Sequence, residues 1–315
     1  FADLLEPAIE YASRGFPASL SQYRHTLRQR ETLAAMPETA DIFLPGGNVP
    51  RPGERFVQKR LAGTLRLVAE RGRDAFYKGD VARSIAAFLA KRGGLLTAED
   101  FADHAGEWTE PVAAAYKDYV VYQHPPNSQG FAALMVLNVL KRFDFRAIGH
   151  NSFEYVHLLT EAVKLAFRDR DRYLTDPAFS PVPLGLLLSD EYAGRLAAAV
   201  DMVRALPASA APMGGDTAFA AVADGEGNAA SFIQSLYFEF GSGVADGETG
   251  VLLQNRGSFF SLDPGHVNAL EPNKRTFHTL MPAMACLDGK PALLYGTMGG
   301  EGQPQTQTAI FTRIV

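Results

Sequence analysis

The chain has a single cysteine and no long apolar run, and each of these features excludes a class of protein. Cys286 stands alone among 315 residues, which excludes an intrachain disulfide framework and a zinc site built from several cysteines. The longest apolar runs, such as residues 131–137, fall well short of the ~20 residues that a membrane-spanning helix needs. Charged residues make up 21% and the formal net charge is −5, which argues against a nucleic-acid surface.

Hydrophobic residues make up 47% of the chain, enough for a sizeable core in one large or two small domains. The chain opens at Phe1 with a helical pattern already under way, and residues 309–315 also resemble an element cut short. We therefore expect both ends to be truncations of a longer protein. We expect a cytoplasmic location. Because the true N-terminus is expected to be absent from this sequence, the periplasm and secretion stay open as alternatives.

Apolar residues spaced by three and four predict that the first two thirds of the chain are rich in helices. Such patterns cover residues 1–12, 56–70, 80–89, 130–140 and 151–174, and another helix starts at Thr97 with Asp100 positioned to complete its cap. The alternating charges of residues 168–172 are interpreted as a solvated face with local ion pairs rather than a binding site. Residues 201–215, rich in Ala, Pro, Ser and Gly, predict an exposed linker.

Strand patterns dominate after the linker. Residues 119–123 already predict one strand earlier in the chain. Residues 217–223 and 229–237 flank the turn residues 224–228 and predict a hairpin. Residues 281–287 and 290–297 predict a second hairpin, because the Asp288-Gly289 pair between them is a strong turn signal.

The junction between linker and strand carries candidate chemistry. If the chain is cut between Asp216 and Thr217, the hydroxyl and the new α-amine share one residue. An α-amine with a pKa of about 7.7–8 can act as a general base at neutral pH, so the Thr217 hydroxyl needs no histidine. The cut can be autocatalytic, through attack of this hydroxyl on the Asp216 carbonyl. The same sequence is also typical of a Thr that merely opens a strand.

Two features support the catalytic interpretation. Ser235 lies across the hairpin turn from Thr217, so the two hydroxyls can approach on paired strands. Gly299 and Gly300 directly follow the strand that ends near Thr297, and their two N–H groups could form an oxyanion hole. Taken singly, these glycines are equally typical of an ordinary loop.

These residues, with others along the whole chain, resemble the γ-glutamyltransferases, a family of N-terminal-nucleophile hydrolases. The clearest matching segments are residues 72–80, 93–101, 215–217, 224–228, 240–243, 249–253 and 298–300. The resemblance implies an α+β fold, a four-layer αββα sandwich, and self-cleavage into two subunits. Residues 1–216 would be a large-subunit portion without its N-terminal section, and residues 217–315 a small-subunit portion truncated at its C-terminus, together forming one domain.

The resemblance also implies roles for individual residues. Thr217 would be the nucleophile, Ser235 its hydroxyl partner, and Gly299 with Gly300 the oxyanion hole, while Asp216 would supply the carbonyl of the cleaved bond. These enzymes need no metal or organic cofactor. The implied partners are a small-molecule amide and two subunits from one precursor, with a dimer of heterodimers as an open option.

The substrate positions depart from the usual γ-glutamyl pattern. Typical members hold the substrate amine with an Asn-Asn-x-x-Asp-Asp-Phe-Ser stretch, and Phe259 stands here where the amine-binding Asp would be. His278-Thr279 replaces a Ser-Ser pair that binds a carboxylate, and Tyr237 replaces a substrate-binding Asn. A phenyl ring cannot neutralise an ammonium group. Asn255 and Arg256 fall in the same stretch, and Arg256 is interpreted either as a substrate contact or as a structural ion-pair partner.

Residues 233–243 and 299–305 are more similar to the branch that contains oxamate amidohydrolase. A small anionic amide needs residues that bind its carboxylate but none that bind an amine. The candidates for binding the carboxylate are His278, Thr279 and Arg256. A structural role is the alternative for His278. We therefore predict a self-processing amide hydrolase acting on a small carboxylate-bearing amide such as oxamate. The alternatives are a γ-glutamyl transferase or hydrolase acting on glutathione-like substrates, and an inactive homologue that serves as a binding scaffold.

Overall fold

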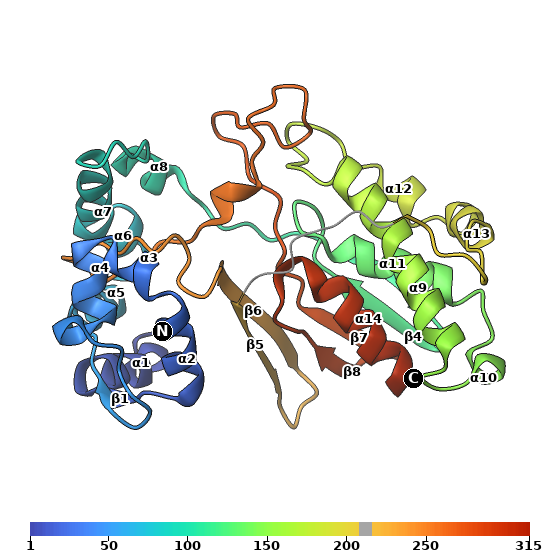
Figure 1. The fold of residues 1–315 in the computed structure, drawn as a ribbon, viewed down its shortest axis with the longest axis horizontal. Helices are drawn as coiled ribbons and strands as arrows, with labels where there is room; N and C mark the ends of the chain where they lie inside the picture. Colours follow the sequence, from blue (N-terminus) through green and yellow to red (C-terminus); the bar gives the residue numbers. More distant parts are fainter. Residues whose placement is uncertain (208–215) are drawn as a thin grey trace. The chain divides into compact units, whose positions relative to one another are not determined.

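The computed structural model describes residues 1–207 and 216–315, so most of the expected linker, at 208–215, lies outside the described residues. The chain divides into two compact units (Figure 1). Unit 1 contains Phe1–Glu107 and Glu239–Gln254, and unit 2 contains Trp108–Phe238 and Asn255–Val315. The expected boundary between residues 216 and 217 concerns a cleaved bond rather than a packing boundary, and it stays a prediction.

Unit 1 is mainly helical. Its elements are α1 (Ala2–Arg14), β1 (Phe16–Pro17), α2 (Leu20–Arg28), α3 (Arg30–Ala34), α4 (Pro37–Phe43), η1 (Pro45–Gly47), β2 (Arg55–Phe56), α5 (Lys59–Arg71), α6 (Arg73–Tyr77), α7 (Asp80–Ala90) and α8 (Ala98–Asp103). Helix α1 packs on α5, and Leu33, Phe43 and Phe56 belong to a small hydrophobic core. The predicted cap of α8 is confirmed, because Thr97 and Asp100 form a capping box.

Unit 2 combines helices with two antiparallel sheets. Its elements are β3 (Val112–Tyr116), β4 (Tyr119–Gln123), α9 (Gly130–Leu140), α10 (Phe145–Ile148), α11 (Phe153–Tyr173), α12 (Leu184–Leu187), α13 (Asp190–Ala198), β5 (Asp216–Ala223), β6 (Ala229–Tyr237), η2 (Arg256–Phe259), β7 (Ala283–Leu287), β8 (Lys290–Tyr295), η3 (Gly300–Gly302) and α14 (Gln303–Ile314). The mixture of helices and sheets confirms the expected α+β class. Among the described helices, none is both long and apolar enough to cross a membrane.

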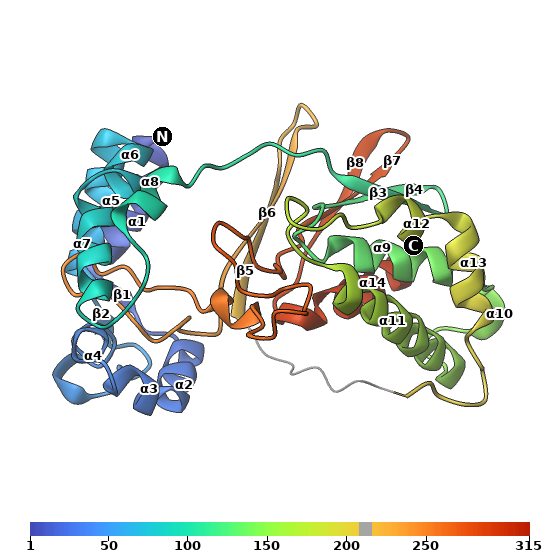
Figure 2. The ribbon, with the colours of Figure 1, turned by 90° about the horizontal axis from the view of Figure 1, so that it is seen from above.

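The core of unit 2 is organised around α9. All of its residues are buried, because it contacts β3 and β4 on one side and α11, α13 and α14 on others. Figure 2 shows α9 between the strands and α11. A helix that is apolar all round must be covered all round. The loop that precedes α9 is consequently held at the centre of the unit.

The four-stranded sheet has the order β3-β4-β7-β8, with every neighbouring pair antiparallel. The predicted turn between β7 and β8 is confirmed. Asp288 and Gly289 have φ of 50° and 75°, the left-handed values that a tight two-residue hairpin turn requires. The chain then leaves β8 toward the predicted oxyanion glycines.

The β5–β6 hairpin is also confirmed, and it packs against the end of β8. Asp224 closes its turn by accepting hydrogen bonds at Oδ1 from the N–H groups of Glu226 and Asn228, both at 2.9 Å. Gly296 approaches the ring of Phe219 so closely that a Cβ added to the glycine would lie 2.2 Å from Cδ2 of the ring. This contact brings the segment after β8 alongside the first residues of β5.

The charge run at the end of α11 differs from the solvated face that its sequence predicts. The local ion pairs are present, with Arg168 3.1 Å from Asp169 and Arg170 2.7 Å from Asp171. However, Asp169 and Arg170 are only 3% and 1% exposed. Arg170 follows the buried Ala166 by four residues, so the helical repeat turns it toward the interior. The expectation of a solvated face is therefore wrong for these two residues.

The close approach of Gly296 to Phe219 predicts a specific sensitivity. Gly296→Ala should lower the free energy of unfolding by about 1–3 kcal/mol, because the new methyl group overpacks the junction between β5 and β8. Gly225→Ala, where an added Cβ meets no atom within 4 Å, is the matched control and should be nearly neutral. Equal urea midpoints for the two variants would contradict the packing assigned to Gly296.

Candidate active site

The structure places Thr217 and Ser235 opposite each other at an irregularity of the β5–β6 hairpin. Asp216 pairs with Tyr237 and Ala218 pairs with Gln234, so the single residue Thr217 faces two residues of β6, of which Ser235 is one. This is the arrangement of a β-bulge, which re-aims side chains beside it. The expected approach of the two hydroxyl-bearing residues on paired strands is thus present in the register. The side chain of Asp216 lies outside the described residues.

Tyr237 joins this hydroxyl pair to the rest of the candidate site. Its backbone N–H donates a hydrogen bond to Oγ of Ser235 at 2.9 Å. Its φ of 82° is unusual for a residue with a large side chain. Its buried ring lies 4.7 Å from the ring of Phe238 and 4.6 Å from that of Phe259. Burial, and next the charge of Glu301, raise the pKa of the Tyr237 hydroxyl.

Arg256 is the most unusual polar residue of the site. It begins η2 and is only 2% exposed. Its Nη1 donates to Oγ1 of Thr279 at 2.9 Å, whereas Nε and Nη2 are buried and have no hydrogen-bond partner among the described residues. Burial lowers the pKa of the guanidinium to about 10, which leaves it charged at neutral pH. No described carboxylate hydrogen-bonds to this guanidinium or acts on its pKa, so the structure shows no ion-pair partner for Arg256 among the described residues.

Aromatic rings surround the guanidinium. Its Cζ lies 5.7 Å from the centroid of the Tyr237 ring, a cation–π contact. Phe259 lies between the rings of Tyr237 and Phe277, at 4.6 Å from each. Phe259 therefore contributes an apolar wall beside Tyr237. Such a wall strengthens the field of a nearby cation, because it excludes water.

His278 and Thr279 lie next to Arg256. Thr279 is fully buried, and Oγ1 of its side chain accepts the hydrogen bond from Arg256. Burial, together with the charges of Arg256 and His124, lowers the pKa of His278 to about 3. The ring is therefore neutral at pH 7. Because the N–H of Leu280 donates to Nδ1 at 3.2 Å, the proton of the neutral ring sits on Nε2, which remains a donor.

Gly299 and Gly300 occupy the turn that leads from β8 into α14. Their φ values of 112° and 52° lie in the region that residues with a Cβ avoid. The carbonyl of Gly299 accepts a hydrogen bond from the N–H of Gly302, and that of Gly300 accepts one from the side chain of Gln129. The two glycines thus sit in a fixed turn with their carbonyls engaged, and their role as oxyanion donors stays a prediction.

Six of the predicted site residues are linked around Tyr237 and Arg256, whereas Asn255 has a different role. Tyr237 contacts Ser235, Phe259 and Arg256. Arg256 in turn donates to Thr279, and its charge acts on the neighbouring His278. Asn255 instead holds backbone: its Oδ1 accepts from the N–H of Phe238 at 3.1 Å, and its own N–H donates to the carbonyl of Leu236 at 3.2 Å. Asn255 therefore stabilises the loop around Tyr237.

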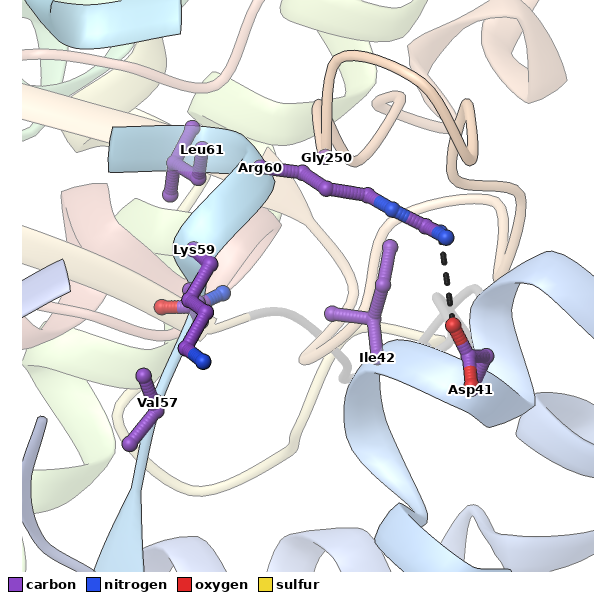
Figure 3. A pocket seen from close by; sticks show the side chains of 8 residues that line it. Asp41, Ile42, Val57, Lys59, Arg60, Leu61 and Gly250 are labelled. Carbon is purple, nitrogen blue, oxygen red and sulfur yellow. Dashed lines mark ion pairs between the residues drawn. The ribbon is translucent and has the colours of Figure 1, made fainter. Parts of the chain in front are cut away.

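A separate hollow in unit 1 contains none of these residues. It has a volume of about 210 Å³ and lies at the start of α5, where Arg60 pairs with Asp41 at 3.3 Å (Figure 3). Its polar lining consists of Asp41, Gln58, Lys59 and Arg60. Within the described ranges, no three metal-ligating side chains converge.

Sequence reasoning missed two polar residues that touch the site, Gln129 and Arg170. Gln129 is fully buried directly before α9, and Arg170 is the buried arginine of α11. A signal for Arg170 was present, since it falls on the apolar repeat of its helix with Val163 and Ala166. Gln129 follows two polar residues in a loop, and nothing in that pattern distinguishes it from a surface glutamine.

Comparison with known proteins agrees with this architecture. The family model described as gamma-glutamyltranspeptidase matches residues 1–315. The chain is 60% identical over 314 residues to a "Glutathione hydrolase-like YwrD proenzyme" of Bacillus subtilis, covering 100% of this chain and 60% of that protein. It is 41% identical over 314 residues to an oxamate amidohydrolase proenzyme of Klebsiella pneumoniae, covering 100% of this chain and 59% of that protein.

A solved structure gives the same result. The cephalosporin acylase of Bacillus halodurans superposes with a TM-score of 0.90 at 38% identity, covering 99% of this chain and 58% of that one. The fold is thus that of the N-terminal-nucleophile hydrolases and acylases. The chain belongs to the gamma-glutamyltranspeptidase family. It spans about 60% of the length of the curated relatives.

The low pKa of His278 predicts a contribution to acid sensitivity. In the unfolded chain the His278 ring takes up a proton near pH 6.5, whereas in the folded protein it does so only near pH 3. The free energy of unfolding therefore falls as the pH drops between these values. His278→Gln should reduce the loss of stability between pH 7 and pH 5 by about 2 kcal/mol. The exposed His150→Gln variant is the control and should keep the wild-type pH dependence in urea titrations. An unchanged slope in His278→Gln would contradict the burial assigned to this ring.

Proposed function

We propose that the protein is a self-processing amide hydrolase with Thr217 as nucleophile, acting on a small amide that carries a carboxylate, such as oxamate. The single observation that carries the substrate class is the buried guanidinium of Arg256. Nε and Nη2 of this group have no partner among the described residues, and Nη1 is fixed by Thr279. A substrate carboxylate would accept from the two unmet donors in the bidentate geometry that guanidinium favours.

The nucleophile is activated within one residue. After the bond between Asp216 and Thr217 is cleaved, the α-amine of Thr217 takes the proton of its own hydroxyl as Oγ1 attacks the amide carbon. The carbon–nitrogen bond then breaks, the leaving amine departs with that proton, and an ester on Thr217 remains. Water attacks this ester, releases the acid and restores the hydroxyl. Oxamate and water would give oxalate and ammonia, and no metal or organic cofactor is required.

The remaining residues stabilise charge during this reaction. The amides of Gly299 and Gly300 would receive the oxyanion, each donor being worth roughly 3 kcal/mol. Ser235, opposite Thr217 in the register, would orient the nucleophile. His278 is neutral with its proton on Nε2, so it can donate to a carboxylate oxygen beside Arg256 without adding a second charge. One of the relatives, at 41% identity, carries the name oxamate amidohydrolase, which supports this assignment.

A second candidate is a γ-glutamyl hydrolase or transferase. The observation that favours it is the name "Glutathione hydrolase-like" of the relative with 60% identity. A γ-glutamyl substrate carries an ammonium group next to its carboxylate, and that ammonium requires an anionic partner. Phe259 gives an apolar wall at the position expected for that partner, so the described contacts support the first candidate better. Processing into two subunits belongs to both candidates, and the relatives are named as proenzymes.

Self-cleavage gives the first test. The full-length protein should run as two bands on a denaturing gel, and N-terminal sequencing of the smaller band should begin at Thr217. Thr217→Ala should leave a single uncut band, because the attacking hydroxyl is gone, and should abolish amide hydrolysis. Thr276→Ala serves as the control and should still be cut. A single band for the wild type would instead favour the inactive scaffold.

Carboxylate recognition gives the second test. Arg256→Met should raise the KM for oxamate about tenfold to hundredfold, because charge-assisted hydrogen bonds of about 1.5–3 kcal/mol are lost. Its free energy of unfolding should stay equal or rise, since the variant removes a buried charge that no described carboxylate meets. The exposed Arg172→Met variant, at the end of α11, is the matched control and should keep the wild-type KM.

The choice between the two candidates follows from the substrates of the wild type. Ammonia release from oxamate, with little cleavage of a γ-glutamyl anilide, is the expected result. Turnover of the anilide alone would select the γ-glutamyl candidate. An Arg256→Met variant with unchanged KM for oxamate would show that the guanidinium does not bind the carboxylate.

A further inference from the structure

Gln129 contacts three of the candidate site residues at once. Its backbone N–H donates to the carbonyl of His278 at 3.0 Å. Its side-chain Nε2 donates to the carbonyl of Thr279 at 3.0 Å and to that of Gly300 at 2.9 Å. The residue is 0% exposed. One buried amide therefore ties the loop that holds Arg256 to the turn that holds the predicted oxyanion donors.

Arg170 fixes the direction of this amide. Its Nη1 donates to Oε1 of Gln129 at 3.0 Å. A guanidinium can only donate and a backbone carbonyl can only accept, so only one orientation of the amide satisfies both sides. Gln129 thus has its oxygen toward Arg170 and its nitrogen toward Thr279 and Gly300. An isosteric glutamate would satisfy Arg170 but not the two carbonyls.

Arg170 is itself held on several sides. Its Nε and Nη2 contact Asp171 at 2.8 and 2.7 Å, and Nη2 lies 3.6 Å from Oε2 of Glu301. Its Cζ lies 4.0 Å from the ring centroid of Phe167 and 5.4 Å from that of Phe277. Because α11 is packed against α9, this guanidinium is a rigid support rather than a mobile surface charge.

We propose that Gln129 is a positioning residue for catalysis and that Arg170 orients it. Gln129 fixes the position of the Gly300 turn relative to the Thr279 loop. The oxyanion donors and the residues that bind the carboxylate can then act on the same substrate. The inference rests on the proposed amide hydrolysis, and adds residues that do not touch the reacting atoms. Its physical basis is strict geometry, since oxyanion donors must lie about 2.7–3.1 Å from the developing charge.

The test compares two variants of Gln129 with a variant of a buried amide inside α9. Gln129→Glu keeps the size and the Arg170 contact but removes both donors, and Gln129→Met removes them without adding a charge. Both should lower kcat for oxamate about tenfold to hundredfold per active site, counted by the burst of ammonia, because small displacements of catalytic groups carry such costs. Asn138→Leu is the control: Asn138 is 3% exposed and donates to the carbonyl of Leu188 at 3.2 Å.

The outcomes distinguish a failure of the role of Gln129 from a failure of the proposed amide hydrolysis. If Gln129 has a purely structural role, its variants should have a lower melting temperature and fewer active sites. The kcat per active site would then keep the wild-type value in all three variants, and that result would overturn the role of Gln129. If Gln129→Glu fails to fold, the neutral Gln129→Met variant decides the question by the same measurement. A wild type that neither self-cleaves nor releases ammonia overturns the proposed function, and the inference falls with it.

Discussion

The candidate site depends on one constraint: a buried positive charge that no described carboxylate neutralises. Removing a guanidinium from water costs several kcal/mol unless its donors are met. Arg256 has one donor met by Thr279, and its flanking groups are the aromatic ring of Tyr237 and a neutral His278. Neither can neutralise the charge. The surrounding fold must therefore hold the group in place, and an anionic substrate would recover the free energy that this burial costs.

The loops around this charge are held by polar contacts rather than by sheet or helix. Residues 127–129 run beside residues 276–280, with a parallel bridge between Ser128 and His278. Asn127 donates from Nδ2 to the carbonyl of Thr276 at 2.6 Å, and the hydroxyl of Ser128 donates to the carbonyl of Leu280. Because the fully buried α9 follows directly, the position of these loops is fixed by the core. Buried polar networks of this kind specify one geometry when every member is satisfied.

Much of the fold could be predicted from sequence, because its signals are local. The bounds of β4 and α9 match the predicted residues, and the Asp288-Gly289 turn was recognisable from two residues. The facing of Thr217 and Ser235 followed from hairpin spacing alone. The role of Gln129 could not be predicted, since its partners lie about 150 and 171 residues away along the chain. Arg256 remained ambiguous for the same reason: only the folded chain shows that no described carboxylate meets it.

The charge arrangement also bears on which substrates the site would reject. An ammonium group near Arg256 would need an anion, and the carboxylate whose field reaches Tyr237 is that of Glu301. Burial raises the pKa of Glu301, and Arg170, 3.6 Å away, counters this rise. To serve an ammonium, Glu301 would have to leave the guanidinium that also orients Gln129. Under the proposed function, selection against α-amino substrates and support of the Gly300 turn would then depend on the same arginine.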